Sequence, residues 1–171
     1  MAEEIINRVA NSKLKVFDLE DYYQEGKRSM IDIKDWLEHE LILREKDFRT
    51  AVKTHDWSQY KNHYLALHCS NDAIVPNWAY MLIALALKPF VKHVAFGSLK
   101  DLETELYHNQ LAQLDLTAYI DKPVIIKGCS HKPVPKSAFI MATNLLETVA
   151  KTLMFGEACS FVPLYKRSLP K

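Results

Sequence analysis

Strand-like and helix-like segments alternate along the chain from residue 63 to its end. The predicted strands cover 63–67, 91–96, 123–127 and 152–155. The predicted helices lie between them, at 76–87, 99–114 and 135–151. This alternation is typical of βαβ units, in which the strands run parallel. The sequence therefore predicts an α/β fold with a mostly parallel sheet built from consecutive βαβ units.

The first sixty residues predict an α+β extension of this core. We expect helices at 3–9 and 44–54 and strands at 14–17 and 30–33. No glycine- or serine-rich linker separates residues 1–60 from the core at 61–160. We therefore expect residues 1–171 to form a single domain, in which the extension packs on the core.

The expected carboxyl edge of the sheet is the predicted location of a functional site. Right-handed crossovers bring the ends of parallel strands to one edge, and ligands of open α/β sheets bind there. Three of the four glycines, Gly97, Gly128 and Gly156, follow predicted strands. A glycine at such a position allows a ligand or another backbone segment to approach closely.

All three cysteines occur in one short phrase, in which Cys-Ser is followed by Val-Pro. The copies are Cys69-SNDAIVP, Cys129-SHKPVP and Cys159-SFVP, and each follows an apolar, strand-like stretch. If the strands share one edge, the three thiols converge there. Thiolates are ligands that select zinc or iron–sulfur iron.

These cysteines predict a metal centre with Cys69, Cys129 and Cys159 as ligands. His131, two residues after Cys129, is the nearest candidate for the fourth position, and His68 is the second. Zinc and a [4Fe–4S] cluster with one open iron both fit three cysteine ligands. The predicted function is that of a cysteine-ligated metal-binding protein with an accessory role in iron–sulfur or sulfur metabolism, acting with a protein partner.

Two alternatives remain open at this point, and one of them is an enzyme. In the first, Cys129 acts without metal as the nucleophile of a persulfide or thiol-transfer enzyme, with His131 as its base. In the second, the cysteines are incidental small buried residues of a structural or interaction protein.

Charge and hydropathy bear on location and partners. The formal net charge of +1 gives no support to nucleic-acid binding. The amino terminus does not resemble a signal peptide, and the longest apolar run, near residues 80–87, is too short to span a membrane. We expect a cytoplasmic protein with no membrane or nucleic-acid partner, and base rates favour a homodimer.

Four stretches of the chain resemble one protein family. They are NRVANSKLKVFDLEDYY, KTHDWSQYKNHYLALHCSNDAIVPNWAYMLIA, VIIKGCSHKPVP and FGEACSFVPLYKR, and they include all three cysteine phrases. The chain resembles a bacterial family of unknown function, number 2480 in the series of such domains. The resemblance implies no specific activity, although members resemble neighbours of sulfur-mobilisation genes for iron–sulfur cluster assembly.

Overall fold

The computed structural model describes residues 14–128, 131–157 and 159–167, and these form an α/β fold. It is consistent with the predicted single α/β domain, and most strand pairs are parallel as predicted. Within this fold the chain divides into two compact units. Unit 1 comprises Met1–Tyr23 and Tyr107–Lys171, and unit 2 comprises Gln24–Leu106.

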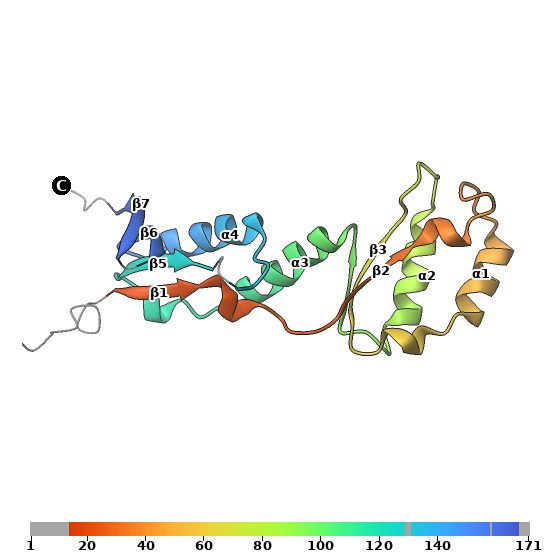
Figure 1. Cartoon of the computed structure of the whole chain (residues 1–171), viewed down its shortest axis with the longest axis horizontal. Helices are drawn as coiled ribbons and strands as arrows, with labels where there is room; N and C mark the ends of the chain where they lie inside the picture. Colours follow the sequence, from red (N-terminus) through yellow and green to blue (C-terminus); the bar gives the residue numbers. More distant parts are fainter. Residues whose placement is uncertain (1–13, 129–130, 158, 168–171) are drawn as a thin grey trace, which may run out of the picture. The chain divides into compact units, whose positions relative to one another are not determined.

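Unit 1 contains a four-stranded sheet with the order β1-β5-β6-β7 (Figure 1). Strands β1 (Lys15–Asp18), β5 (Pro123–Lys127) and β6 (Thr152–Glu157) are parallel, and β7 (Ser160–Lys166) pairs antiparallel with β6. Helix α4 (Lys136–Glu147) connects β5 to β6, and short 3-10 helices cover Leu19–Tyr22 and Thr117–Tyr119.

One face of this sheet carries the core of unit 1. Small residues of α4 pack against the apolar residues of the strands, together with Tyr107 and Leu111 from the end of α3 (Leu99–Leu111). The fully buried members are Phe17, Leu19, Tyr107, Leu111, Val124, Ile126, Ala138, Ala142, Leu146, Ala150 and Leu153. The alanines let α4 approach the sheet closely, because they have no side chain beyond Cβ.

Unit 2 contains a parallel three-stranded sheet with the order β2-β3-β4. Its strands are β2 (Arg28–Asp32), β3 (Tyr64–His68) and β4 (His93–Phe96). Its helices are α1 (Glu45–Thr54) and α2 (Asn77–Leu87), with the first part of α3, and short 3-10 helices cover Ile33–Trp36 and Trp57–Tyr60.

Both faces of the sheet in unit 2 are covered. Leu65 and Leu67 face α1 and α2, whereas Tyr64 and Ala66 face Leu102 and Leu106 of α3. This alternation follows from the two-residue period of a strand. Strand β3 is therefore buried on both faces, which explains its continuous apolar sequence.

The two units repeat one arrangement. In each, a strand ending in aspartate leads into a 3-10 helix, and the aspartate accepts a hydrogen bond that caps that helix: Asp18 from the N–H of Glu20, Asp32 from that of Lys34. The first strand of a parallel βαβ unit then pairs with the strand that ends in aspartate. The register is the same in both units, because Asp18 lies beside Lys127 and Asp32 beside His68 at the ends of the paired strands. Matching core positions of the two helices are Ala79 with Ala138, Ile83 with Ala142, and Leu87 with Leu146.

Most of these elements lie where the sequence predicts them, but their division between two sheets was not predicted. The four core strands were expected at one edge, whereas β3 and β4 lie in one sheet and β5 and β6 in the other. The reason is that β1 and β2 from the first sixty residues each begin a separate sheet. Strand β7 was missed, and the predicted helix at 3–9 lies outside the described residues.

No helix in the described part of the chain is long and apolar enough to cross a membrane.

Candidate functional site

Polar side chains gather at the carboxyl edge of the sheet in unit 2. The Asp32 carboxylate accepts hydrogen bonds from the N–H groups of Lys34 and Ser70, each at 3.1 Å, and lies 3.8 Å from Nε2 of His68. Burial raises the pKa of Asp32, but the hydrogen bonds from Ser70 and Lys34, with nearby His68, outweigh it and hold that pKa below its usual value. Within the described residues, buried Nε2 of His68 has no hydrogen-bond partner.

Cys69 lies directly after β3, half-buried against the core that α1 and α2 form. Nearby Tyr80 has a raised pKa, first because it is buried and then because Cys69 and Asp32 lie close. This edge holds several groups that can donate or accept protons, but the described contacts do not pair the thiol with a base.

The matching edge of unit 1 is built around an ion pair. The ammonium group of Lys127 lies 3.1 Å from Asp18 and 3.9 Å from Glu157. The hydrogen bond to Asp18 and the charges of Asp18 and Glu157 raise the pKa of Lys127. Gly128 follows with a φ of +138°, and a Cβ at this position would lie 2.6 Å from the Cβ of Leu19. Glycine is therefore required where β5 passes the 3-10 helix after β1.

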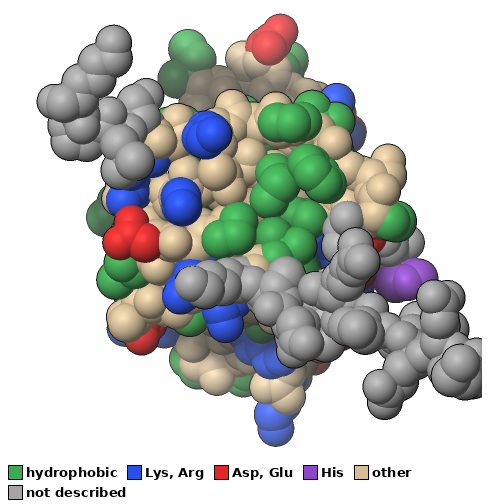
Figure 2. Space-filling model, turned by 90° about the vertical axis from the view of Figure 1, so that its left-hand side faces the viewer, with side chains coloured by type: hydrophobic (Ala, Val, Ile, Leu, Met, Phe, Trp, Pro, Cys, Tyr) green, Lys and Arg blue, Asp and Glu red, His purple; other side chains and the backbone are tan. Residues whose placement is uncertain are grey.

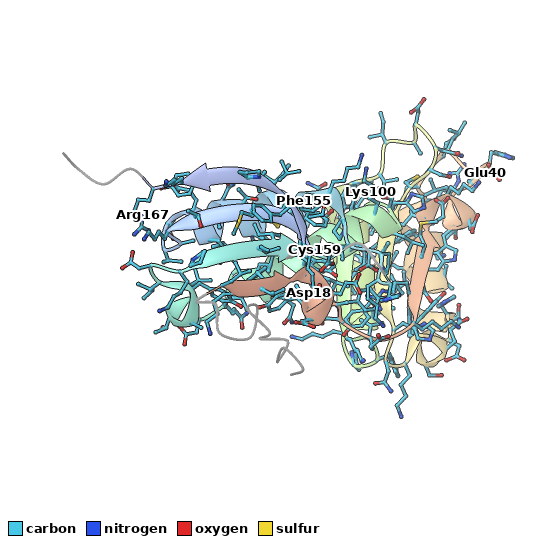
Figure 3. All side chains as sticks on the ribbon, turned by 60° about the vertical axis from the view of Figure 1, so that its left-hand side comes forward. Asp18, Glu40, Lys100, Phe155, Cys159 and Arg167 are labelled. Carbon is cyan, nitrogen blue, oxygen red and sulfur yellow. The ribbon has the colours of Figure 1, made fainter. Side chains whose placement is uncertain are left out.

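Unit 1 also contains an apolar cavity of about 540 Å³ beside this edge. Phe139 of α4 and Phe155 of β6 meet there edge to face, with ring centroids 5.8 Å apart. Figure 3 shows Phe155, Cys159 and Asp18 in the part of unit 1 where the strands end. The lining consists of Ile126, Val134, Lys136, Phe139, Thr143, Phe155 and Leu164.

The only charged side chain in this lining belongs to Lys136, the first residue of α4. Pro135 precedes it, the first turn contains no acidic residue, and no side chain caps this start of α4. The start of a helix carries partial positive charge from the aligned peptide dipoles. The cavity therefore combines apolar walls with a positive end.

The cysteine phrases do not share one structural context. Cys69 precedes α2 in unit 2, whereas Cys159 lies exposed in the turn between β6 and β7 of unit 1. Cys129 lies outside the described residues, so the prediction that it is a nucleophile stays untested. His131 is exposed, and its N–H donates to Glu20 at 2.9 Å.

The prediction of a cysteine-ligated metal-binding protein is wrong. Among residues 14–128, 131–157 and 159–167, no three His, Cys, Asp or Glu side chains come together in a group that could hold a metal ion. The prediction assumed one shared strand edge, and the strands fall in two sheets. The ligand set of Cys69, Cys129, Cys159 and His131 stays a prediction because Cys129 is not described, and no described contact supports zinc or an iron–sulfur cluster.

Sequence reasoning missed both the repeat and the cavity. The repeat has a signal in the sequence, because Asp18-LEDY and Asp32-IKDW share an aspartate, an apolar residue, a second acid and an aromatic at the same spacing. The cavity has no comparable signal, since Leu164 reaches it only through the unpredicted strand β7.

Comparison with known proteins identifies a family but no activity. No curated protein and no solved structure matches the chain. A family model described as protein of unknown function (DUF2480) matches residues 3–167, which is nearly the whole sequence. The family that the sequence resembles is thereby confirmed, while its bacterial origin stays a prediction. The chain belongs to the DUF2480 family.

Proposed function

We propose that this protein binds a small apolar molecule that carries one anionic group, such as a carboxylate, in the cavity of unit 1. The observation that carries this proposal is the apolar cavity of about 540 Å³ with Lys136 and the start of α4 at its rim. Its volume lies in the range of small-molecule pockets, which are lined mainly by apolar side chains with few polar groups.

Chemical arguments define the ligand class. Ile126, Phe139 and Phe155 offer an alkyl chain or ring an apolar wall. The hydroxyl group of Thr143 already donates to the carbonyl of Phe139 at 2.7 Å, so it is occupied within the helix. Lys136 is the charged group at the rim, the positive end of the α4 dipole adds to its charge, and a carboxylate is the complementary ligand group.

Calorimetric titration with decanoate tests the proposal, with decanol as the uncharged probe of equal chain length. We expect decanoate to bind more tightly than decanol. Lys136→Met keeps an apolar side chain but removes the charge, and should weaken decanoate binding about five- to tenfold while leaving decanol unaffected. Equal affinity for the two probes, or no decanoate binding, would refute the proposal.

A second variant tests the location. Thr143→Phe adds a ring within the lining and should abolish binding of both probes. Asn144→Phe adds the same ring to an exposed neighbouring position that is not part of the lining, and is the matched control. If both variants bind decanoate like the wild type, the ligand occupies a different place.

We further propose a cytoplasmic location, supported by the free thiols of Cys69 and Cys159, since cysteines stay reduced in that compartment.

A further inference from the structure

Strand β4 leaves one edge of the sheet in unit 2 open. It is the last strand in the order β2-β3-β4, and among the described residues only β3 pairs with it. Its counterpart in unit 1, β6, has β7 paired antiparallel on the corresponding side. In unit 1 an antiparallel strand therefore covers the edge that corresponds to the open edge of β4 in unit 2.

Apolar side chains are exposed along this open edge. Met81 and Leu85 of α2 are 65% and 66% exposed. At the end of β4, Phe96 is 70% exposed, whereas the matching Phe155 is 38% exposed. An apolar cavity of about 480 Å³ runs between helix and strand, lined by Met81, Ala84, Leu85, Lys88, Val91, Lys92, His93 and Val94.

The backbone of β4 also has hydrogen-bonding groups on this side. The N–H of Gly97 donates inward to the carbonyl of Leu67 at 3.0 Å. Because successive residues of a strand direct their backbone groups to alternate sides, Val94 and Phe96 direct theirs to the open edge. An edge of this kind, next to exposed apolar side chains, is a template for pairing with another strand.

We propose that a second copy of this chain binds here, with the two β4 strands paired antiparallel about a twofold axis. The pairing would join the two sheets into one six-stranded sheet and bring the two α2 helices together on the same face. Met81 and Leu85 of each copy would then cover the apolar cavity of the other.

A twofold interface brings the same patch of both copies together. Here the edge of β4 and the exposed side of α2 lie side by side, so each can meet its equivalent in the second copy. Charge also favours the antiparallel arrangement. Lys88, the cation on the α2 side of the rim, lies toward the start of β4. A twofold axis through the middle of β4 places the two Lys88 ammonium groups at opposite ends of the interface, where they do not repel each other.

Sedimentation equilibrium over a wide concentration range tests this proposal. We expect the wild type to form a dimer, and the double variant Met81→Glu/Leu85→Glu to be monomeric, because the interface would then bury carboxylates without partners. Ile140→Glu is the matched control: Ile140 holds the position in α4 that Met81 holds in α2, and both are 65% exposed. This control should dimerise like the wild type.

Amide hydrogen exchange locates the contact independently of mutations. The amides of Val94 and Phe96 should exchange more slowly at concentrations where the dimer forms than after dilution. A wild type that is monomeric at its highest soluble concentration would overturn the proposal, and would leave the edge to a foreign strand. A dimer that persists in Met81→Glu/Leu85→Glu, or whose Val94 and Phe96 amides show no concentration dependence, would overturn it as well.

Discussion

The two units share the same order of strands and helices but differ in the segment that follows their third parallel strand. In unit 1 the third parallel strand, β6, turns back through a hairpin into β7, which covers its edge. In unit 2 the third strand, β4, leads into helix α3, and its edge stays open among the described residues. On the side where unit 1 has a cavity walled partly by Leu164 of β7, unit 2 exposes Phe96.

Local sequence decides between hairpin and helix. After Gly97, Ser98 and Asp101 bond each other's backbone N–H groups in the manner of a capping box, at 2.8 and 3.3 Å, which starts α3. After Gly156 the described residues contain no such pair, and Phe161 and Val162 favour a strand. A few residues after the same glycine therefore determine whether a βαβ unit closes its own edge.

Exposed apolar side chains occur in both units, but in different settings. Figure 2 shows hydrophobic side chains gathered beside lysine and arginine side chains on one side of the molecule. In unit 1 the exposed apolar residues include Phe161, Val162 and Leu164 of β7, a strand that is already paired on one side. Strands β4 and β7 are both outermost strands, but β7 contains Pro163, which has no N–H to donate, so unit 2 is the better candidate for strand addition.

The largest expected effect comes from the matched leucines of the two helices. Leu87 and Leu146 are both fully buried, so Leu87→Ala and Leu146→Ala should each lower the free energy of unfolding by about 3 kcal/mol. Urea denaturation followed by far-UV circular dichroism measures both. A loss under about 1 kcal/mol in either variant would mean that its core collapses around the missing side chain.

The same variants test whether the units unfold together. All three tryptophans, Trp36, Trp57 and Trp78, lie in unit 2, so their fluorescence reports that unit alone. Helix α3 supplies Leu102 and Leu106 to one core and Tyr107 and Leu111 to the other. We therefore expect Leu146→Ala to lower the fluorescence midpoint as well. An unchanged midpoint would show that the units unfold independently.

The sequence predicted local elements well because local rules determine them. The bounds predicted for β5, 123–127, match the structure, and α2 begins one residue after the predicted 76 and ends at 87 as predicted, since Pro76, Pro89 and Gly128 mark where these elements begin or end. Strand β7 was missed because Pro163 and the basic residues after it are typical of a tail. The hairpin places that proline on the outermost strand, where it is tolerated.

The partition into two sheets could not be predicted from the same rules. Parallel strands that follow one another favour a single sheet, and nothing between Leu111 and Pro123 marks a change of sheet. The change depends on β1 and β2, which are distant in sequence from the strands they pair with. The predicted metal site required the ends of these strands to lie at one common edge. The same long-range pairing is therefore the reason that the metal-site prediction failed.

The two capping aspartates should differ, by a smaller amount, in how much they contribute to the free energy of unfolding. Asp32 accepts hydrogen bonds from the backbone N–H groups of Lys34 and Ser70, whereas Asp18 accepts one from the N–H of Glu20 and pairs with Lys127. At pH 7 we expect Asp32→Asn to cost about 1–2 kcal/mol of unfolding free energy, and Asp18→Asn less. Urea denaturation at several pH values measures both.

The pH dependence checks the cause. The pKa of Asp32 is lower in the folded state than its usual value of 3.8. Its contribution is therefore complete above that value and is lost as the pH falls through the lower folded pKa. The wild type and Asp32→Asn should converge in stability at acidic pH. A difference that stays constant down to pH values below the folded pKa would show that shape, not charge, makes Asp32 important.

The smallest expected effect is alkaline and comes from the first 3-10 helix of unit 1. Tyr22 and Trp36 hold matching positions in the 3-10 helices, but only Tyr22 titrates. Burial, and then contact with Tyr119, raises the pKa of Tyr22 to about 12. Because the folded pKa lies above the usual value of 10, this contribution is complete below pH 10 and is lost as the pH rises through about 12.

Tyr22→Phe removes that titration and keeps the ring that stacks on Phe17 at 5.1 Å. We expect the variant to lose less stability than the wild type between pH 10 and about 12, measured as the urea midpoint by far-UV circular dichroism. Tyr165→Phe removes a phenol at the periphery of the same core and serves as the control. If Tyr165→Phe reduces the alkaline loss of stability as much as Tyr22→Phe does, that loss comes from the ionisation of phenols in general. The two 3-10 helices would then differ in sequence but not in their response to pH.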